Sequence, residues 1–261
     1  MTDAPDDTAV AMTVPDPDPR RRERPSAVPA AGNRRSHPAP AHLRFFHGPM
    51  DCGKSTLALQ VDFNQARQGR SGLLLTQGDR SGAPRISSRV GLTREAVEVD
   101  ASTDLRLLVR TRWADGQRVD YLIVDEAQFL TPAQVDQLAE LVDESHVDVW
   151  AFGLTTDFRT RLFPGTQRLM EVADDVQRVQ VEVLCWCGLP GLLNARVVDG
   201  ALVRHGATVV VADTAPTPAP DEPSPEAAGA PDVHYQVLCR RHHVLGQLGP
   251  TAAGPGQLAL P

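Results

Sequence analysis

The segment Gly48–Ser55 carries glycine, lysine and serine at the spacing of a phosphate-binding loop. Its sequence, GPMDCGKS, fits the pattern G-x-x-x-x-G-K-[ST]. Glycines let the backbone curl so that successive N–H groups point at a polyphosphate. Lys54 can then reach the β- and γ-phosphates, and Ser55 can ligate Mg²⁺. An apolar run at 43–48 and a helical pattern at 54–68 flank the loop, so the segment predicts a site for a nucleoside triphosphate with Mg²⁺.

A pair of acids, Asp125 and Glu126, ends the predicted strand 119–126. In phosphate-loop proteins an Asp at the end of a neighbouring strand holds the Mg²⁺ shell, and Asp125 suits that role. Glu126 is then placed beyond the metal, where it can accept a proton from an attacking hydroxyl group or water molecule. Ordinary solvated acids are the alternative. The predicted site for a nucleoside triphosphate and Mg²⁺ comprises Gly48, Pro49, Met50, Asp51, Cys52, Gly53, Lys54, Ser55, Asp125 and Gln128.

A third group consists of cysteine and histidine in two close pairs, Cys185 with Cys187 and Cys239 with His242. Three thiolates and one imidazole make a closed, tetrahedral Zn²⁺ site of the structural type. Both pairs fall in a segment too small to hold itself together without such a staple. Buried or free thiols are the alternative, and His243 competes with His242, whose spacing is the more usual one. We predict one structural Zn²⁺ per chain.

The elements that must position these groups indicate an α/β fold. Apolar runs rich in Val, Ile and Leu alternate with helical patterns, which is typical of a parallel sheet with crossover helices on its faces. Thr131-Pro132 opens a helix with a capping box, residues 78–94 are expected to form a turn-rich loop, and Asp199-Gly200 predicts a hairpin. Strands are expected at 43–48, 73–76, 96–100, 119–126, 147–154, 195–203 (two), 208–212 and 233–238, and helices at 54–68, 102–113 and 131–143.

The prolines indicate where the folded part of the chain lies. Eight of the 22 lie in residues 1–40 and nine in 214–261. Such polar, Pro-rich segments bury too little apolar surface to become ordered. We therefore expect a disordered extension over 1–41, a P-loop-type parallel sheet flanked by helices over 42–184, a small zinc-binding β subdomain over 185–245 with a Pro-rich insertion at 214–231, and a disordered tail over 246–261.

Charge and apolar patterning restrict the partners of the chain. The chain has 26 Lys and Arg and 33 Asp and Glu, which gives a net charge of −7 at pH 7 with His neutral. That balance argues against a nucleic-acid partner held mainly by phosphate contacts. No apolar run approaches the ~18 residues of a membrane span, and the N-terminus lacks the apolar stretch of a secretory signal. We expect a cytoplasmic protein without a membrane or nucleic-acid partner, whose four cysteines serve a metal or catalysis rather than disulfides.

The segments GPMDCGKST, VDEAQFL and GLTTDFRTRLFPGTQ, with the paired C-x-C and CRRH elements, occur here in one order. That combination resembles the zinc-containing, tetrameric class of thymidine kinases (type II, a P-loop fold with a lasso subdomain) over about residues 43–243. The resemblance implies transfer of the γ-phosphoryl group of ATP to the 5′-hydroxyl of thymidine by a homotetramer. Glu126 matches the family's general base, and Lys54 is the second implied catalytic residue. The implied cofactors are ATP with Mg²⁺ and a structural Zn²⁺.

The same resemblance implies a pocket for the thymine base. Core packing is the alternative for its side chains, above all for Phe129. Asp79 and Arg80 match a pair near the phosphates, Asn194 falls near the thymine methyl group, and 210–213 replaces a glycine-containing segment that reads the nucleoside. The residues that match the lining of the base pocket are Met50, Phe129, Leu154, Phe158 and Tyr235.

Three other functions fit part of the pattern. A deoxynucleoside kinase with a broader or different preference, such as deoxyuridine, is a close alternative. A nucleic-acid-dependent ATPase would use the Asp125–Gln128 segment as a helicase box, with Glu126 activating water, but it needs a second motor domain and a basic strand channel. A zinc-bearing nucleotide-binding protein without turnover is favoured if the insertion 214–231 blocks the lasso. Thymidine kinase is the function that we predict first.

Overall fold

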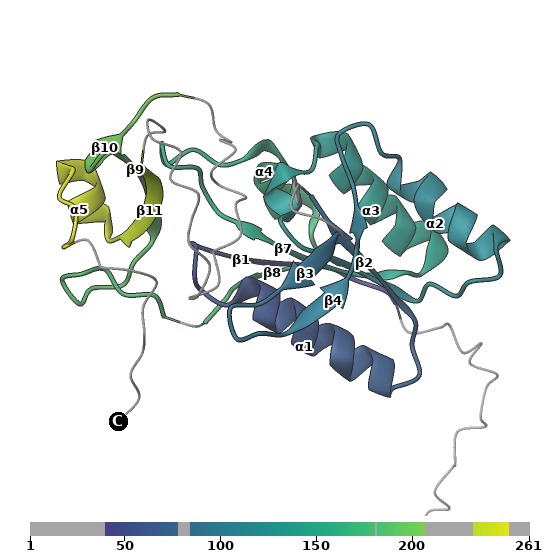
Figure 1. Cartoon of the computed structure of the whole chain (residues 1–261). Helices are drawn as coiled ribbons and strands as arrows, with labels where there is room; N and C mark the ends of the chain where they lie inside the picture. The colour runs from purple at the N-terminus through teal and green to yellow at the C-terminus, as the bar shows by residue number, and fades with distance from the viewer. Residues whose placement is uncertain (1–39, 78–83, 181, 207–231, 251–261) are drawn as a thin grey trace, which may run out of the picture. The chain divides into compact units, whose positions relative to one another are not determined.

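The computed structural model describes residues 40–77, 84–180, 182–206 and 232–250. Its main sheet has six strands in the order β5-β2-β6-β7-β1-β8, and every pair of neighbours is parallel (Figure 1). This confirms the predicted α/β class. The strands are β1 (Leu43–Gly48), β2 (Gly72–Thr76), β5 (Val97–Glu98), β6 (Tyr121–Val124), β7 (Asp148–Leu154) and β8 (Asp175–Arg178).

Helices cover both faces of this sheet (Figure 1). On one face lies α1 (Lys54–Arg67), and on the other lie α2 (Leu105–Ala114), α3 (Pro132–Ser145) and α4 (Pro164–Val172). A short 3₁₀ helix, η1 (Ala127–Phe129), follows β6. None of the helices in the described ranges is long and apolar enough to cross a membrane.

Strand β6 shows why both faces of the sheet need a helical layer. All four of its residues are buried, and successive side chains point to opposite faces. Tyr121 and Ile123 pack in the same cluster as Leu59 of α1, whereas Leu122 and Val124 belong to the cluster that contains the buried side chains of α2 and α3. An apolar run without alternation is therefore what a doubly covered parallel strand requires.

The predicted start of α3 is confirmed in detail. The Thr131 side chain accepts a hydrogen bond from the Gln134 N–H, at 3.2 Å between oxygen and nitrogen, and the Gln134 side chain accepts one from the Thr131 N–H. Pro132 occupies the first helical position, where its missing N–H has no cost. The helix extends to Ser145, two residues beyond the expected end.

The expected loop at 78–94 is wrong in part, because it contains a short antiparallel hairpin. Strands β3 (Arg85–Ser87) and β4 (Thr93–Glu95) pair through Ile86 and Arg94. Only Ile86 of these six residues is buried, so the segment lacks the apolar alternation from which a strand is predicted. Ile86 packs against the α1 side of the core. Strand β8 was also not predicted, because most of its residues are polar; it pairs with the buried β1.

A separate three-stranded antiparallel sheet has the order β10-β9-β11. It is built from β9 (Leu193–Val198), β10 (Ala201–Val203) and β11 (Val233–Leu238), and α5 (Arg240–Leu245) follows β11. Asp199 and Gly200 join β9 to β10 with φ values of 49° and 75°. A two-residue turn with both φ values positive matches the twist of the strands, which confirms the predicted hairpin.

Several expectations fall outside the described residues: the strand 208–212, the insertion 214–231, residues 1–39 of the expected extension 1–41, and residues 251–261 of the expected tail 246–261. The segment 246–250, expected within a disordered tail, is instead part of the described structure. Gly249 N–H donates to Gln236 Oε1 at 3.0 Å, and Gln247 O accepts a hydrogen bond from Trp186 Nε1 at 3.2 Å. The ordered chain therefore continues past α5.

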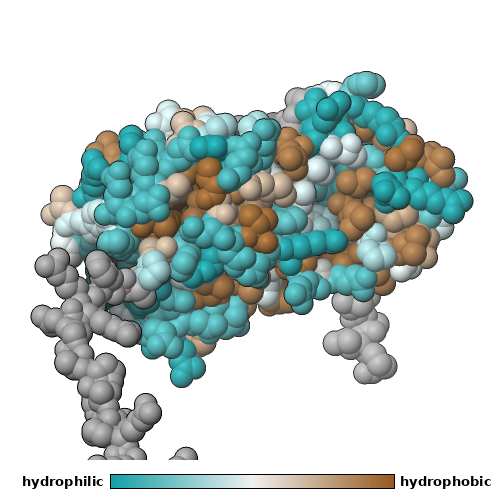
Figure 2. All heavy atoms as spheres, turned by 180° about the vertical axis from the view of Figure 1, so that it is seen from behind, coloured by the Kyte–Doolittle hydropathy of each residue, from teal (hydrophilic) through white to brown (hydrophobic). Residues whose placement is uncertain are grey.

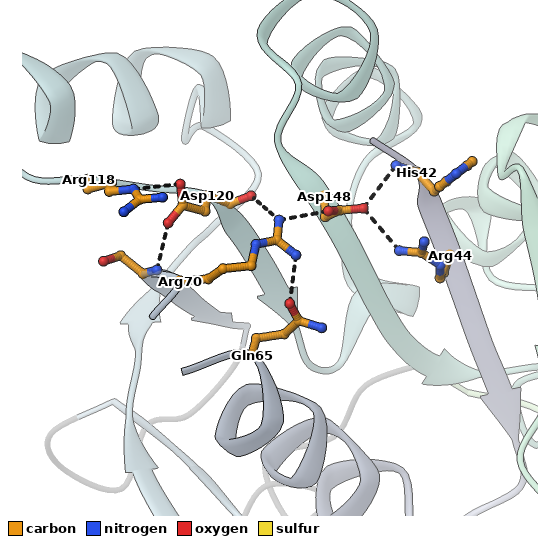
Figure 3. Close-up of polar contacts among 8 residues, drawn as sticks. His42, Arg44, Gln65, Arg70, Arg118, Asp120 and Asp148 are labelled. Carbon is orange, nitrogen blue, oxygen red and sulfur yellow. Dashed lines mark hydrogen bonds and ion pairs between the residues drawn. The ribbon is translucent and has the colours of Figure 1, made fainter. Parts of the chain in front are cut away.

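An ionic network joins the amino ends of the central strands (Figure 3). Asp148, at the start of β7, accepts from the His42 N–H and from Arg44 Nη1, both at 3.1 Å. Its second oxygen accepts from Arg70 Nη2 at 2.7 Å, and the same nitrogen donates to Asp120 O at 3.0 Å. Parallel strands have their carboxyl ends at the opposite edge, so this network fixes the sheet at the edge away from the segment Gly48–Ser55.

Candidate active site and metal centre

The phosphate loop connects β1 to α1, as its flanking sequence predicts. Gly53, immediately before α1, has φ 82° in the left-handed region, and Asp51 has φ 65°. A Cβ atom added at Gly48 would lie 2.5 Å from Cys52 Sγ, so the loop requires a glycine there. Cys52 is completely buried, in keeping with a space-filling role. The loop therefore has a curled backbone that begins at a strand and ends at a helix N-terminus, which is an anion-binding arrangement.

Lys54 lies folded across this loop. Its ammonium group donates to Pro49 O at 2.8 Å and lies 3.8 Å from Cys52 Sγ. The residue is 8% exposed. The positive charge is thus held within the loop that it would serve.

Asp125 lies against the loop from the end of β6. Ser55 donates a side-chain hydrogen bond to its carboxylate, and Lys54 interacts with it favourably. Burial and the neighbouring charge of Glu126 nevertheless raise the pKa of Asp125 well above its usual range. A bound cation would favour the ionised carboxylate, so a hydroxyl group and a buried carboxylate form a donor set that suits Mg²⁺.

Glu126 follows in a left-handed conformation, with φ 54°, which is uncommon for a residue with a side chain. Its carboxylate accepts a hydrogen bond from Gln128 Nε2, and Gln128 Oε1 accepts one from the Leu154 N–H at 2.9 Å. Gln128 is 1% exposed, so its amide is committed to these partners inside the protein. The strained turn and the amide together fix Glu126 between β6 and β7.

The five residues assigned to the base pocket come from separate parts of the fold. Met50 lies in the phosphate loop and Leu154 ends β7. Phe129 is half-buried and meets Phe163 edge-on, with ring centroids 5.6 Å apart. Phe158 follows β7 and Tyr235 lies on β11.

Phe158 and Tyr235 are brought together by a residue that sequence reasoning missed. The guanidinium carbon of Arg196, on β9, lies 4.0 Å from the centre of the Phe158 ring and 5.5 Å from that of Tyr235. Arg196 Nε donates to the Tyr235 hydroxyl at 2.7 Å. The signal was an amide and a guanidinium, Asn194 and Arg196, on one face of a strand whose other face is apolar.

A second missed residue, Asp157, shapes the segment that carries Phe158. Its Oδ1 accepts from the backbone N–H groups of Arg159 and Arg161, each at 2.9 Å. Its Oδ2 accepts from Arg159 Nε at 2.9 Å. Thr160 has a positive φ of 66° in this turn. The pattern Asp-x-Arg is too common to single this carboxylate out from sequence. Asp79, Arg80 and the segment 210–213 lie outside the described residues.

The four predicted metal ligands do come together. The ligand atoms of Cys185, Cys187, Cys239 and His242 all lie within 4.8 Å of one another. Cys185 Sγ is 3.4 Å from His242 Nδ1, and Cys187 Sγ is 4.0 Å from Cys239 Sγ. Three sulfurs and one imidazole at this spacing suit a tetrahedral Zn²⁺.

The two adjacent histidines have different partners. His242 belongs to the group of possible metal ligands, whereas His243 Nε2 lies 3.2 Å from Phe158 O and hydrogen-bonds that carbonyl. His242 stacks on Trp186 instead, with ring centroids 4.2 Å apart. Burial opposes ionisation of the Cys185 thiol, but hydrogen bonds from the Cys187 and Cys239 N–H groups and from His242 outweigh it and lower the pKa of Cys185 to about 6. The thiolate is the form that binds metal.

The small sheet buries little apolar surface of its own. Its core cluster contains Cys185, Ala195, Leu238 and Cys239. Figure 2 shows apolar side chains on the surface at the end of the molecule that carries this sheet. A small core of this kind gains most from a metal staple. The large apolar residues exposed there are Leu184, Trp186, Leu189, Leu192, Val244 and Leu245.

Comparison with known proteins supports one family. The family model for thymidine kinase matches residues 41–243, most of the chain. The chain belongs to the thymidine kinase family. A thymidine kinase from Streptomyces coelicolor is 54% identical over 201 residues, which cover 77% of this chain and 88% of that protein. A thymidine kinase from Cutibacterium acnes is 51% identical over 209 residues, covering 80% and 91%.

More distant relatives carry the same name. A thymidine kinase from Legionella pneumophila strain Paris is 33% identical over 214 residues, covering 81% of this chain and 93% of its own. Among solved structures, the Pif1 helicase from Candida albicans aligns with 53% of this chain and 36% of its own, at 10% identity and a TM-score of 0.33. That likeness is too low to bear on fold or function. The range matched by the family model, 41–243, includes both the candidate phosphate loop and the four Cys and His residues of the candidate metal centre.

Proposed function

We propose that this member of the thymidine kinase family transfers the γ-phosphoryl group of ATP to the 5′-hydroxyl of thymidine, giving dTMP and ADP. The observation that carries the proposal is that Asp125 lies directly against the phosphate loop, hydrogen-bonded to Ser55, with Glu126 next to it in the chain. Membership of the family supplies the substrate, because the relatives at more than 50% identity are named thymidine kinase.

Each part of the site has a role in the proposed reaction. The backbone N–H groups of 48–55 and the Lys54 ammonium bind the phosphates of ATP. Ser55 and Asp125 would hold Mg²⁺, which neutralises phosphate charge when it is bound, and Gln128 belongs to the same site through its contact with Glu126. Cys185, Cys187, Cys239 and His242 would hold a structural Zn²⁺, whose contribution is folding energy rather than chemistry.

Glu126 is the proposed general base. Its carboxylate takes the proton of the 5′-hydroxyl as the hydroxyl oxygen bonds to the γ-phosphorus and the bond to the β–γ bridging oxygen of ATP breaks. Most of the rate enhancement comes from positioning and from charge stabilisation, because phosphoryl transfer passes through a loose transition state. Gln128 contributes by holding the carboxylate in place.

The proposed pocket for the base is lined by Met50, Phe129, Leu154, Phe158 and Tyr235. Phe158 and Tyr235 share the contact with Arg196, which supports a common function for two residues 77 positions apart in the chain. Closure of such a pocket excludes water and so protects ATP from hydrolysis. We further propose a cytoplasmic homotetramer with the domain limits given above.

A substrate panel tests the proposal. The purified protein with MgATP is offered thymidine, deoxyuridine, deoxycytidine or single-stranded DNA, and nucleoside monophosphate and ADP are both quantified. We expect dTMP and ADP in equal amounts with thymidine, and far less product with deoxycytidine. Preference for deoxyuridine would indicate a different deoxynucleoside kinase. ADP formation that is stimulated by DNA, without any nucleoside monophosphate, would refute the kinase function.

A further inference from the structure

Strand β9 belongs to the small sheet, yet one of its faces carries two polar side chains directed at the phosphate loop and the segment after β7. Successive residues of a strand point to opposite faces. Ala195 packs in the core beside the metal ligands, whereas Asn194 and Arg196 lie on the opposite face. Both are almost fully buried, at 2% and 3% exposure. Polar groups buried to this extent must be held by specific partners.

Asn194 ties β9 to the phosphate loop. Its Oδ1 accepts a hydrogen bond from the Met50 N–H at 2.8 Å, and its Nδ2 donates to Thr156 O at 3.4 Å. One side chain of the small sheet therefore contacts both the loop and the segment that leads to Phe158. These two hydrogen bonds fix the position of β9 relative to the proposed base pocket.

Arg196 performs the corresponding function two residues later. Its planar guanidinium lies over the Phe158 ring at 4.0 Å, and its Nε donates to the Tyr235 hydroxyl at 2.7 Å. A stacked guanidinium can hold an aromatic ring by its face and an oxygen by its edge at the same time, which the compact ammonium of lysine cannot do. The backbone of Phe158 is held as well, because its carbonyl accepts a hydrogen bond from His243 Nε2.

We propose that Arg196 is a positioning residue for the nucleoside, which holds Phe158 and Tyr235 at the separation that the base requires. The inference rests on the proposed function, because it takes both aromatic residues as walls of the base pocket. Arg196 does not touch the reacting atoms in this account. Its loss should therefore weaken thymidine binding while ATP binding and the chemical step are largely retained.

The test uses the full-length, zinc-loaded protein with thymidine and ATP varied separately. Arg196→Met keeps the length of the side chain but removes its charge, its planar stack and its donor. We expect the KM for thymidine to rise about tenfold, with kcat and the KM for ATP within about twofold of wild type. Arg196→Lys should restore little of the loss, because a lysine cannot stack and donate in the same geometry.

Arg204→Met, directly after β10 of the same sheet, is the matched control. Arg204 Nη2 donates to His243 O at 2.7 Å and to Val244 O at 2.8 Å, so it supports the end of α5 rather than the two aromatic residues. This variant should keep the wild-type KM for thymidine. Zinc content and tryptophan fluorescence, to which Trp186 stacked on His242 contributes, show for each variant whether the small sheet is intact.

Tyr235→Phe separates positioning from general stability, because it keeps the ring and removes the hydroxyl group that accepts the Arg196 hydrogen bond. We expect the KM for thymidine to rise about threefold, and the double variant with Arg196→Met to be no worse than Arg196→Met alone. If Arg196→Met fails to fold, Tyr235→Phe alone decides, and a wild-type KM for thymidine in it overturns the inference.

Turnover by the wild type distinguishes failure of the proposed function from failure of the proposed role of Arg196. If the wild type forms no dTMP, the proposed function is wrong and the inference falls with it. If the wild type forms dTMP and a folded, zinc-loaded Arg196→Met has an unchanged KM for thymidine, the inference alone is wrong. A loss confined to kcat would also contradict it, because that result would assign Arg196 to the chemical step.

Discussion

The side-chain amide of Gln128 donates a hydrogen bond to the carboxylate of Glu126. The same amide accepts from the N–H of Leu154 at 2.9 Å, so the end of β7 determines where the carboxylate lies. A Cβ atom added at Gly153 would approach Gln128 N and Oε1 to 3.0 Å, so the close packing here depends on a glycine. The proposed general base is thus held by a buried neighbour as well as by its own backbone.

Replacing this amide should therefore impair the chemical step. In Gln128→Met, with a side chain of similar length, Glu126 loses its donor and the Leu154 N–H is left unpaired. We expect kcat to fall at least ~10-fold with little change in the affinity for ATP, and the free energy of unfolding to fall by about 1–3 kcal/mol. Steady-state kinetics and urea denaturation measure the two effects. A kcat equal to that of the wild type would show that Glu126 needs no such support.

Lys54 offers an unusually clean test of the phosphate site, because it is the single lysine of the chain. Periodate-oxidised ATP, which reacts with amines, should label Lys54 and be displaced by MgATP. Lys54→Ala should bind ATP at least ~10-fold more weakly and lose phosphoryl transfer as well. Peptide mapping locates the label and equilibrium binding gives the affinity. ATP binding of wild-type strength in Lys54→Ala would contradict the assignment.

Zinc should be required for the integrity of the small sheet. Elemental analysis should find about one zinc per chain, and a chelator should lower the melting temperature and change the emission of Trp186. Cys239→Ser should lose zinc, whereas the matched variant Cys52→Ala, in the phosphate loop, should keep it. A carefully purified protein that lacks zinc yet melts at the same temperature with and without added zinc would refute a structural metal.

The ionic network at the far edge of the sheet should make stability dependent on pH. Burial favours the neutral form of Asp148, but hydrogen bonds from Arg70, the His42 N–H and Arg44 outweigh it and hold the pKa of Asp148 below its ordinary value of 3.8. An acid with a lowered pKa stabilises the folded state above that ordinary value, and this contribution is lost as the pH falls through the lowered pKa.

Asp148→Asn measures that contribution. The variant should be less stable than wild type by about 1–3 kcal/mol at pH 7, and the difference should shrink as the pH falls below the ordinary value. Asp143→Asn, at an exposed position of α3, is the matched control and should change stability little. Urea titrations across the pH range provide the comparison. If Asp148→Asn and wild type differ in free energy of unfolding by the same amount at neutral and acidic pH, ionisation of Asp148 is not the cause of that difference.

The parts of the fold that sequence predicted are those where local rules suffice. Val, Ile and Leu runs marked the buried strands, Thr131 and Gln134 marked the start of α3, and Asp199-Gly200 marked the hairpin. Strands β3, β4 and β8 were missed because they are short and mostly exposed, so their pairing depends on partners distant in the chain. Strand β8, for example, is defined by its register on β1.

In the candidate site, too, some residues could be predicted from local sequence patterns and others could not. Fixed spacing predicted the phosphate loop, the two acids that follow β6 and a group of Cys and His residues, and the structure brings Cys185, Cys187, Cys239 and His242 together. The partners of these residues were not predictable, because no local pattern says that Gln128 reaches Glu126 or that Arg196 reaches Phe158. The reach of Arg196 depends on how two separate sheets pack, and that is a property of the whole fold.

The proposed role of Glu126 is tested most directly in Glu126→Gln, by measuring ATP affinity and single-turnover formation of dTMP in the same preparation. The substitution keeps the size of the side chain and removes its ability to accept a proton. We predict ATP affinity close to wild type and dTMP formation slower by at least ~10². Formation of dTMP at the wild-type rate would remove Glu126 from the reaction and contradict the mechanism.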